Sequence, residues 1–519
     1  MRNRRSARLL TTFGTFVFVG IASLGLARPA RAQVVFEPAF HQALYTSVTT
    51  STRTTYRMKI PVGRGGSRMR ISFRAGDGAL NLHAATVALA ATQGNLASPP
   101  VAITFNGSPG FTANAQTRVT SDPIALPVTF GNEVYVSFDV DGTMGASNIN
   151  NFPDSYAWAG GSVTAQNPST GAWYPRLVAV DTIDVEGPST IAMVALGDSI
   201  TEGYVSGGIS GDFSRNDNIR DSWAAVAQGL LGVPVVNAAV SGQGVFDATA
   251  RLQHDVFTMQ GLTDCLVLIG TNDLGGNTAE AIEAGLSTLF DDLRPVCRVW
   301  AGTLLPKEQN CCSDYATVVA RRSAVNDWIR HQAKVNGVID FEPVLAQPGN
   351  VNQFAPGLGA DGIHPTVAGQ LLMGKEAARV LSPIVAPHIE AVRPASGSSS
   401  GGTTVEITGV NFVPGSTVTI GGVPATHVQV SASSDLKATA GPHDVGPASI
   451  VVTNPDGRSA TLAVGFTYVD SPDASPQSQF GLASGGCSSS RANPSLLLLV
   501  AGMVLVRWRG SRRRRAQVG

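Results

Sequence analysis

A serine that directly follows a buried strand is the first residue of the chain whose setting suggests chemistry. Residues 194–203 read VALGDSITEG, so an apolar strand ends in Gly-Asp-Ser and brings the hydroxyl of Ser199 to the edge of a sheet. The backbone amides that follow such a serine can face a developing oxyanion. A serine at this kind of junction is more often a helix cap than a nucleophile, so Ser199 alone decides little.

Three further motifs follow in order along the chain. Gly242 ends the segment NAAVSG, and its missing Cβ lets the backbone amide approach a substrate closely. Asn272 lies in GTND, where a side-chain amide can donate to the same oxyanion. Asp361 precedes His364 by three residues in DGIHP, so its carboxylate can bond Nδ1 and leave Nε2 free to take the serine proton. Together the four motifs predict nucleophilic catalysis by a serine.

The set resembles the SGNH (GDSL-type) hydrolase family, whose name-giving residues correspond here to Ser199, Gly242, Asn272 and His364. The resemblance implies an enzyme, a serine hydrolase of carboxylic esters that works through an acyl-enzyme. Ser199 would be the nucleophile, His364 the general base and then acid, and Asp361 the residue that orients the imidazolium. The implied oxyanion hole consists of the Ser199 amide, the Gly242 amide and the Asn272 side chain.

The resemblance covers roughly residues 190–382, where short apolar runs alternate with helical patterns. We expect strands at 191–196, 233–236, 265–269, 296–301 and 338–341, and helices near 222–231, 279–293, 314–335 and 366–381. Strands that alternate with helices predict a parallel, doubly wound sheet with its site at the carboxyl ends of the strands. The expected fold is therefore a central α/β three-layer SGNH (flavodoxin-like) domain.

The flanking regions have β character. The segment 33–187 contains period-2 stretches such as RMRISF at 68–73, which predict an antiparallel β-sandwich of jelly-roll type. The phrases GGTTVEITG and VVTNPDG resemble a TIG (IPT) immunoglobulin-like module, an Ig-like β-sandwich. The predicted parts are a signal peptide (1–32), a β-sandwich accessory domain (33–187), an SGNH hydrolase domain (188–385), a TIG/IPT domain (386–469), a linker (470–486) and a C-terminal sorting or anchor segment (487–519).

Length and composition agree with several domains. A chain of 519 residues is too long for one ordinary domain, and its 57 Gly and 30 Pro favour turn-rich β structure over long helices. The charges balance over the whole chain, but both ends are basic and the body between them is net acidic. An acidic body argues against a nucleic-acid partner, which would need a basic face.

Both ends of the chain resemble targeting signals of exported proteins. Several Arg precede an apolar run from 9 to 26, and Ala30-Arg31-Ala32 follows, which predicts cleavage by a signal peptidase after Ala32. An uncleaved anchor helix and a twin-arginine route stay open. At the other end, Cys487, an apolar run at 496–506 and an Arg cluster resemble a MYXO-CTERM sorting signal, with a plain tail anchor as the alternative. We therefore expect an exported protein at the cell surface, on the outer membrane or outside the cell, with only tail-mediated or transient membrane association.

The cysteines and the search for metal-binding patterns say less about the function than the serine motifs do. Cys265 and Cys297 open neighbouring predicted strands and could form a disulfide, whereas Cys311 and Cys312 are adjacent in a loop. No His, Cys and Asp cluster has metal-ligand spacing, so we expect neither a metal nor a cofactor. The segment DVDG at 139–142 hints at a calcium turn, but the other ligands of such a loop are missing.

The sequence leaves the substrate and one rival function open. Residues 205–220 are polar, which favours short acyl groups, such as acetyl on a sugar of a polysaccharide, over lipid esters. The rival is a surface carbohydrate-binding or adhesion protein with a vestigial hydrolase core. The sequence does not predict the oligomeric state or a ligand of the TIG-like module.

Overall fold

The computed structural model describes residues 34–167, 171–188, 191–205, 218–432, 434–455 and 457–470. The predicted signal peptide, the linker beyond residue 470 and the sorting segment lie outside these ranges, as does most of the 205–220 segment. Within the described ranges, no helix is both long and apolar enough to cross a membrane.

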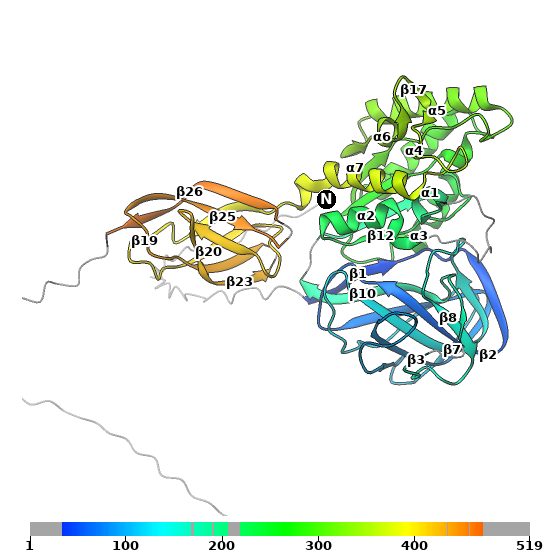
Figure 1. Cartoon of the computed structure of the whole chain (residues 1–519), viewed down its shortest axis with the longest axis horizontal. Helices are drawn as coiled ribbons and strands as arrows, with labels where there is room; N and C mark the ends of the chain where they lie inside the picture. The colour runs from blue at the N-terminus through cyan, green and yellow to red at the C-terminus, as the bar shows by residue number, and fades with distance from the viewer. Residues whose placement is uncertain are drawn as a thin grey trace, which may run out of the picture. The chain divides into compact units, whose positions relative to one another are not determined.

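The N-terminal part of the chain is all β (Figure 1). Its strands are β1 (Val34–His41), β2 (Thr46–Pro61), β3 (Met69–Leu89), β4 (Val101–Ile103), β5 (Phe111–Ala113), β6 (Arg118–Thr120), β7 (Glu133–Ala146), β8 (Tyr156–Ala159), β9 (Ala172–Trp173) and β10 (Val180–Pro188). They pair in the order β1-β10-β3-β7-β2-β8-β9, with β4, β5 and β6 on β3, and each of these pairings is antiparallel. The predicted β character is confirmed, and the jelly-roll type stays a prediction.

The central part alternates strands and helices. Its elements are β11 (Met193–Gly197), α1 (Ser199–Glu202), η1 (Ile219–Asp221), α2 (Trp223–Leu231), β12 (Val235–Asn237), α3 (Val245–Asp255), β13 (Asp264–Leu268), η2 (Thr271–Asp273), α4 (Ala279–Leu293), β14 (Arg298–Gly302), α5 (Tyr315–His331), β15 (Gly337–Ile339), α6 (Phe341–Leu345), β16 (Ala346–Gln347), β17 (Asn350–Phe354) and α7 (Val367–Val385). The five main strands pair in parallel in the order β12-β11-β13-β14-β15.

This strand order determines where the helices lie. The chain steps from β11 outward to β12 and then returns past β11 to β13, so the order reverses once. Because parallel crossovers are right-handed, the reversal sends α2 to one face of the sheet and α3, α4 and α5 to the other. In agreement, α2 packs on α7, while α3 packs on α4 and α4 on α5. The reversal point, beside β11 and β13, is where open α/β sheets bind ligands.

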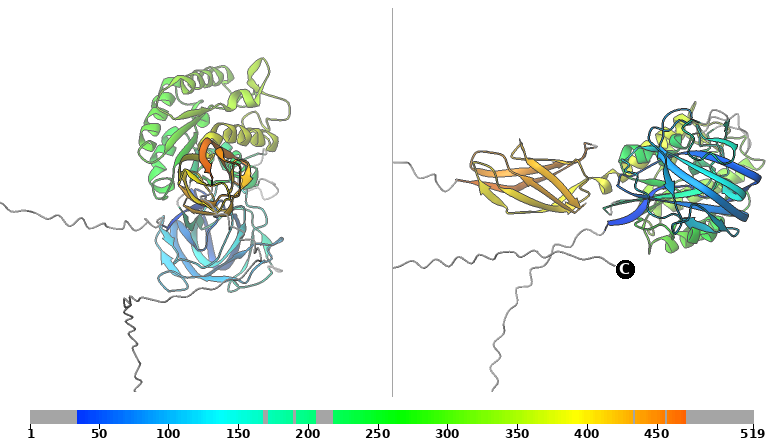
Figure 2. Two further views of the ribbon diagram at one scale, coloured as in Figure 1. Left: turned by 90° about the vertical axis from the view of Figure 1, so that its left-hand side faces the viewer. Right: turned by 90° about the horizontal axis from the view of Figure 1, so that it is seen from below.

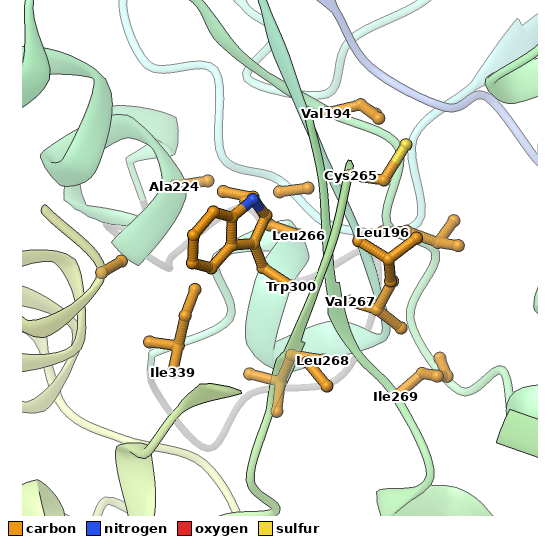
Figure 3. Close-up of a cluster of buried hydrophobic side chains, with 14 of the residues drawn as sticks. Val194, Leu196, Ala224, Cys265, Leu266, Val267, Leu268, Ile269, Trp300 and Ile339 are labelled. Carbon is orange, nitrogen blue, oxygen red and sulfur yellow. The ribbon is translucent and has the colours of Figure 1, made fainter. Parts of the chain in front are cut away.

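Side chains of the sheet fill both faces of the core. Figure 3 shows the alternation along β13: Leu266 and Leu268 point to the side of Trp300, and Cys265 and Val267 point to the other. These four side chains of β13 are buried, because helices cover both faces of a parallel sheet. This double burial explains why the predicted strands read as continuous apolar runs.

Two differences from the predicted elements have local causes. The helix α3 was not predicted, because its buried face includes Arg251 and Asp255, which break the apolar periodicity of a helix. The helix predicted at 314–335 ends earlier, at His331, because Gln332 takes an extended conformation with ψ of 154° while its N–H still bonds Trp328. The helix predicted at 366–381 continues to Val385.

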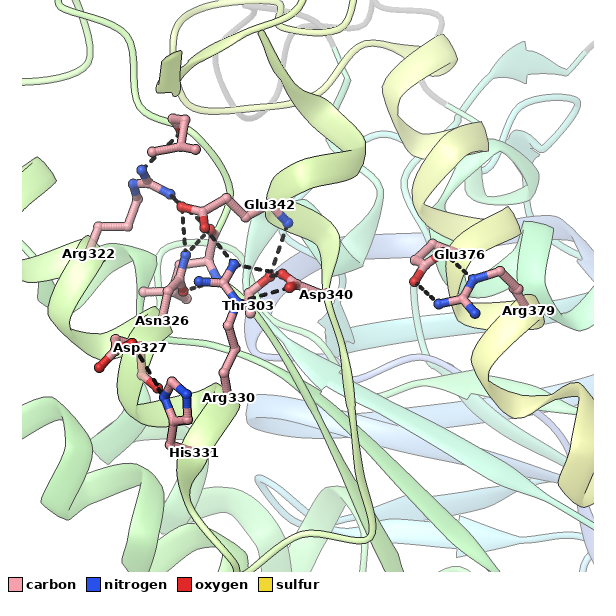
Figure 4. A network of polar contacts seen from close by, with 12 residues as sticks. Thr303, Arg322, Asn326, Asp327, Arg330, His331, Asp340, Glu342, Glu376 and Arg379 are labelled. Carbon is pink, nitrogen blue, oxygen red and sulfur yellow. Dashed lines mark hydrogen bonds and ion pairs between the residues drawn. The ribbon is translucent and has the colours of Figure 1, made fainter. Parts of the chain in front are cut away.

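A disulfide and a buried ion pair brace this domain. Cys265 and Cys297 are bonded, which closes the pairing that the sequence left open, and Cys311 and Cys312 are free thiols. On α5, Arg322 pairs with Glu342 of α6, and both side chains are buried (Figure 4). Asn326, also on α5, donates to the same carboxylate at 3.1 Å.

The C-terminal part forms a separate sandwich of two sheets (Figure 2). Its strands are β18 (His388–Arg393), β19 (Ser396–Ser398), β20 (Thr404–Val410), β21 (Thr417–Ile420), β22 (Val423–Pro424), β23 (Thr426–Ala432), β24 (Asp435–Thr439), β25 (Gly446–Thr453) and β26 (Ser459–Val469). One sheet has the order β18-β20-β24-β23 and the other β19-β26-β25-β21-β22. Alternate residues of these strands, among them Val405, Ile407, Ile450 and Val452, form the core between the sheets.

Candidate active site

Three residues that the sequence singled out meet at hydrogen-bond distance. The Oγ of Ser199 lies 2.8 Å from Nε2 of His364. On the other side of the ring, Nδ1 of His364 lies 2.8 Å from Oδ2 of Asp361. A hydroxyl next to one ring nitrogen and a carboxylate next to the other is the arrangement that lets an imidazole take a proton from the hydroxyl.

The turn before Ser199 has room only for glycine. A Cβ on Gly197 would lie 2.3 Å from the Thr201 hydroxyl oxygen and 2.6 Å from the Leu268 carbonyl oxygen. Asp198 then caps the short helix α1, because its Oδ1 accepts the N–H of Ile200 at 3.0 Å. The chain therefore leaves β11 in a tight turn, with Ser199 as the first residue of α1.

The loop before α7 holds the histidine. Oδ1 of Asp361 accepts the backbone N–H of Ile363 at 3.0 Å and that of His364 at 2.8 Å, while Oδ2 faces the ring. Burial acts to raise the pKa of Asp361, but the hydrogen bonds and charge of His364 outweigh it and lower the pKa to about 2. The carboxylate is thus ionised at neutral pH and fixed in direction by its own loop.

The two other predicted residues follow the strands on either side of β11. Gly242 comes after β12 and has φ of +84°, a backbone conformation that residues other than glycine rarely adopt. Asn272 lies in η2, after β13, and its Nδ2 donates to the carbonyl of Gln243 at 2.8 Å. The structure thereby links Asn272 to the loop of Gly242, at the edge of the sheet where Ser199 lies.

Two buried charged groups near the site were not predicted. The side chain of Lys307 is buried, and its Nζ has no hydrogen-bond partner among the described residues. Burial lowers the pKa of Lys307 to about 8, and the charge of Asp198 acts in the opposite direction. Burial also raises the pKa of Asp198 to about 6. No sequence signal marked Lys307, because it sits in a loop without periodicity.

Tyr204 makes a further contact at the site that no sequence motif indicated. Its ring lies 4.3 Å from the imidazole of His364, centroid to centroid, with an angle of 37° between the planes. Its backbone N–H donates to the carbonyl of Ser199 at 3.0 Å, so the same turn holds nucleophile and ring. An aromatic residue five positions after the serine was the available signal, but nothing in the sequence related it to the distant histidine.

Protein donors occupy the carboxylates of the segment 139–142, which the sequence had already left without the other ligands of a calcium loop. Asp139 accepts hydrogen bonds from Arg53 and from Thr55, and Asp141 accepts one from Asn81 at 2.7 Å. Among the described residues, no group of three or more His, Cys, Asp and Glu side chains could hold a metal ion. The arrangement at Ser199 is suited to acid–base and nucleophilic chemistry by side chains.

Comparison with known proteins assigns two of the domains. Residues 195–372 match the GDSL-like Lipase/Acylhydrolase family, and residues 387–468 match the IPT/TIG domain. None of the curated proteins compared with the chain matches it.

Solved structures are similar to the chain over part of its length. They include Est24, a carbohydrate acetylesterase from Sinorhizobium meliloti, at 15% identity over 38% of this chain and 100% of that one, with a TM-score of 0.32. An aryl esterase from M. smegmatis matches at 18% identity over 37% of this chain and 99% of that one, with a TM-score of 0.32. A GDSL-like lipase from Bacteroides thetaiotaomicron matches at 18% identity over 37% and 88%, with a TM-score of 0.31.

The family matches cover the central and C-terminal parts, and the motif of Ser199 lies inside the first of them. The protein therefore contains a GDSL-like lipase/acylhydrolase domain followed by a C-terminal IPT/TIG domain.

Proposed function

We propose that the protein is an exported serine esterase that hydrolyses carboxylic esters through an acyl-enzyme. The observation that carries the proposal is the continuous line of hydrogen bonds from Ser199 Oγ through His364 to Asp361, each 2.8 Å long. A vestigial core in a binding or adhesion protein would have no reason to keep three side chains, two of them far from the third in sequence, in this geometry. The geometry therefore supports the esterase over the binding protein.

The proposed reaction begins at the ester carbonyl. His364 takes the proton of the Ser199 hydroxyl through Nε2 while the oxygen attacks the carbonyl carbon, and Asp361 stabilises the imidazolium that forms. The carbonyl oxygen becomes an oxyanion, and the N–H groups of Ser199, Gly242 and the Asn272 side chain would receive it. His364 then gives its proton to the leaving alcohol oxygen, which leaves the acyl group on Ser199.

Water completes the cycle by the same groups. His364 accepts a proton from water, the resulting hydroxide attacks the acyl carbon, and the oxyanion again needs its donors. Collapse of the second tetrahedral intermediate releases the carboxylic acid and returns the proton to Ser199. In each half of the cycle His364 first accepts a proton and then donates it. Its orientation by Asp361 therefore matters in both halves.

The finer features of the proposal come from the sequence. The segment at 205–220, which follows the nucleophile in the sequence, is polar and supports short acyl groups such as O-acetyl on carbohydrate over lipid esters. The basic apolar N-terminus supports export, and the Cys487 motif with its Arg cluster supports a sorting tail that leaves the protein at the cell surface or releases it. The disulfide between Cys265 and Cys297 is consistent with an oxidising compartment.

The test is hydrolysis of p-nitrophenyl esters of graded chain length by the full chain, with an acetylated polysaccharide alongside. Turnover that is greatest with acetate and disappears in Ser199→Ala is the expected result. Replacement of the exposed Ser313 by Ala serves as the matched control and should leave turnover unchanged. A preference for acyl chains of about eight carbons or more, which need an extended apolar trough, would contradict the short-acyl proposal. No turnover of any ester by folded protein would contradict the esterase itself.

A further inference from the structure

A buried carboxylate connects the catalytic turn with the N-terminal all-β region. Glu202 ends α1, and its side chain is fully buried. Its Oε2 accepts the backbone N–H of Ser241 at 2.8 Å and the hydroxyl of Ser241 at 2.6 Å. Its Oε1 accepts the backbone N–H of Asn148, from the loop between β7 and β8, at 3.0 Å. Glu202 is therefore shared between the residue before Gly242 and a loop of another domain.

Asn148 makes a second contact, through its side chain. Its Nδ2 donates to the carbonyl oxygen of Ser241 at 3.0 Å. That carbonyl belongs to the same peptide group as the N–H of Gly242, the proposed oxyanion donor. In a trans peptide the C=O and the N–H point in opposite directions, and within the described ranges the cis peptide is that of Arg393 and Pro394. The bond from Asn148 therefore sets the direction of the Gly242 N–H.

This peptide needs such a restraint. Gly242 has φ of +84°, and a Cβ built on it would meet no atom within 4 Å, so nothing packs against that side of the residue. Glycine has a wide choice of backbone conformations, so the peptide before it can rotate at low steric cost and turn the N–H away. Asn148 donates a hydrogen bond to the carbonyl of this peptide, and the N–H of Ser241 donates to Glu202, which holds the preceding peptide.

We propose that Asn148 is a positioning residue for the oxyanion hole, which holds the peptide between Ser241 and Gly242 so that its N–H faces the tetrahedral intermediate. The proposal rests on the proposed esterase function and gives the N-terminal all-β region a part in catalysis. A donor on the carbonyl also polarises the peptide, which makes its N–H a stronger donor to the oxyanion. Asn148 acts on the reaction only through this peptide and touches no reacting atom.

The test compares two variants of the same loop in the full chain. Asn148→Ala removes the donor to the Ser241 carbonyl, and we expect kcat for p-nitrophenyl acetate to fall about 10- to 100-fold, somewhat less than when an oxyanion donor itself is removed. KM should change little, because the ground-state carbonyl depends less on the oxyanion hole. The matched control is Asn151→Ala, since Nδ2 of Asn151 donates to the carbonyl of Glu202 at 2.7 Å rather than to the 241–242 peptide.

If Asn148 had only a structural role, the two substitutions would have equal effects, because each removes one side-chain hydrogen bond between the same loop and the central domain. We expect a similar fall in Tm for both but a large fall in kcat only for Asn148→Ala. Inhibition by a trifluoromethyl ketone, whose adduct with Ser199 carries an oxyanion, should weaken by the same factor as kcat/KM. If the alanine variant does not fold, Asn148→Asp, which keeps the shape but has no amide donor, provides the same comparison.

The outcomes separate the two proposals. Turnover by the parent that is lost in Ser199→Ala, together with unchanged kcat in the Asn148 variants, would overturn only the positioning role. Equal losses of kcat in the variants of Asn148 and Asn151, or a change confined to KM, would overturn it as well. No turnover by the folded parent would overturn both the esterase and the role of Asn148.

Discussion

The Oγ of Ser199 and Nε2 of His364 lie 2.8 Å apart, although 165 positions separate the two residues in the sequence. The two residues come from opposite ends of the central domain, one from the turn after β11 and one from the loop before α7. Only the assembly of the parallel sheet and its helices brings them together. Asp361 holds the other side of the same imidazole, at 2.8 Å from Nδ1, and the first substitution is made there.

Asp361→Asn should lower kcat for p-nitrophenyl acetate at pH 7 by about 10³- to 10⁴-fold, because an amide at this position favours the wrong tautomer of His364. The parent carboxylate has its pKa lowered to about 2, so it stays charged in any assay above pH 4. Replacement of the exposed Asp444 by Asn is the control, and its kcat should equal that of the parent. An Asp361→Asn variant with more than a tenth of the parent kcat would contradict the assigned role.

Asn272→Ala should lower kcat by about 10²- to 10³-fold with little change in KM, as expected for the loss of one oxyanion donor. The same change also removes the bond from Nδ2 to the Gln243 carbonyl, so Tm must be measured alongside. Replacement of the exposed Asn350 by Ala provides the control. If the loss appears in KM and not in kcat, Asn272 binds the substrate rather than the transition state.

The free energy of unfolding should depend on pH through Asp198. Burial raises the pKa of this carboxyl from 3.8 to about 6, so the folded chain holds the proton more tightly than the unfolded chain. Asp198 therefore favours folding at low pH, and this contribution is lost as the pH rises from about 4 to about 6. Relative to the parent, Asp198→Asn should be more stable at pH 7 than at pH 4, by up to about 3 kcal/mol.

Guanidinium unfolding of both proteins at pH 4 and at pH 7 tests this prediction. Asparagine can still accept the N–H of Ile200, so the cap of α1 is kept and the comparison isolates the charge. A difference between variant and parent that is the same at both pH values would show that Asp198 does not titrate in this window.

Arg322→Met should lower the free energy of unfolding by about 3 kcal/mol, because it removes one of the two arginines that pair with the buried carboxylate of Glu342 and leaves Arg330 as the other. Arg379→Met is the matched control within Figure 4, since Arg379 pairs with Glu376 on the exposed surface of α7. Its unfolding free energy should scarcely change, because solvent screens an exposed pair. Similar losses in both variants would mean that burial of the Arg322 pair has no special effect.

The sequence by itself was sufficient to identify the residues that belong to local motifs. Asp361 and His364 are three positions apart on one loop, so their spacing in the sequence is enough to predict that they pair. Continuous apolar runs located the five parallel strands to within a few residues, because both faces of such a sheet are buried. The helix α3 was not predicted, since the charged residues Arg251 and Asp255 on its buried face interrupt the apolar periodicity.

The tertiary structure alone decided which polar residues support those motifs. Glu202 and Lys307 are buried near the site and Asn148 is half-buried, but a polar residue in a turn or loop follows no period and has no composition signal. The contact of Asn148 with Ser241 spans 93 positions and two domains, so it exists only when both domains are folded against each other. The sequence determined which groups could do the chemistry, because reactions need particular residue types. The fold decided what holds them in place, because long-range hydrogen bonds form only after packing.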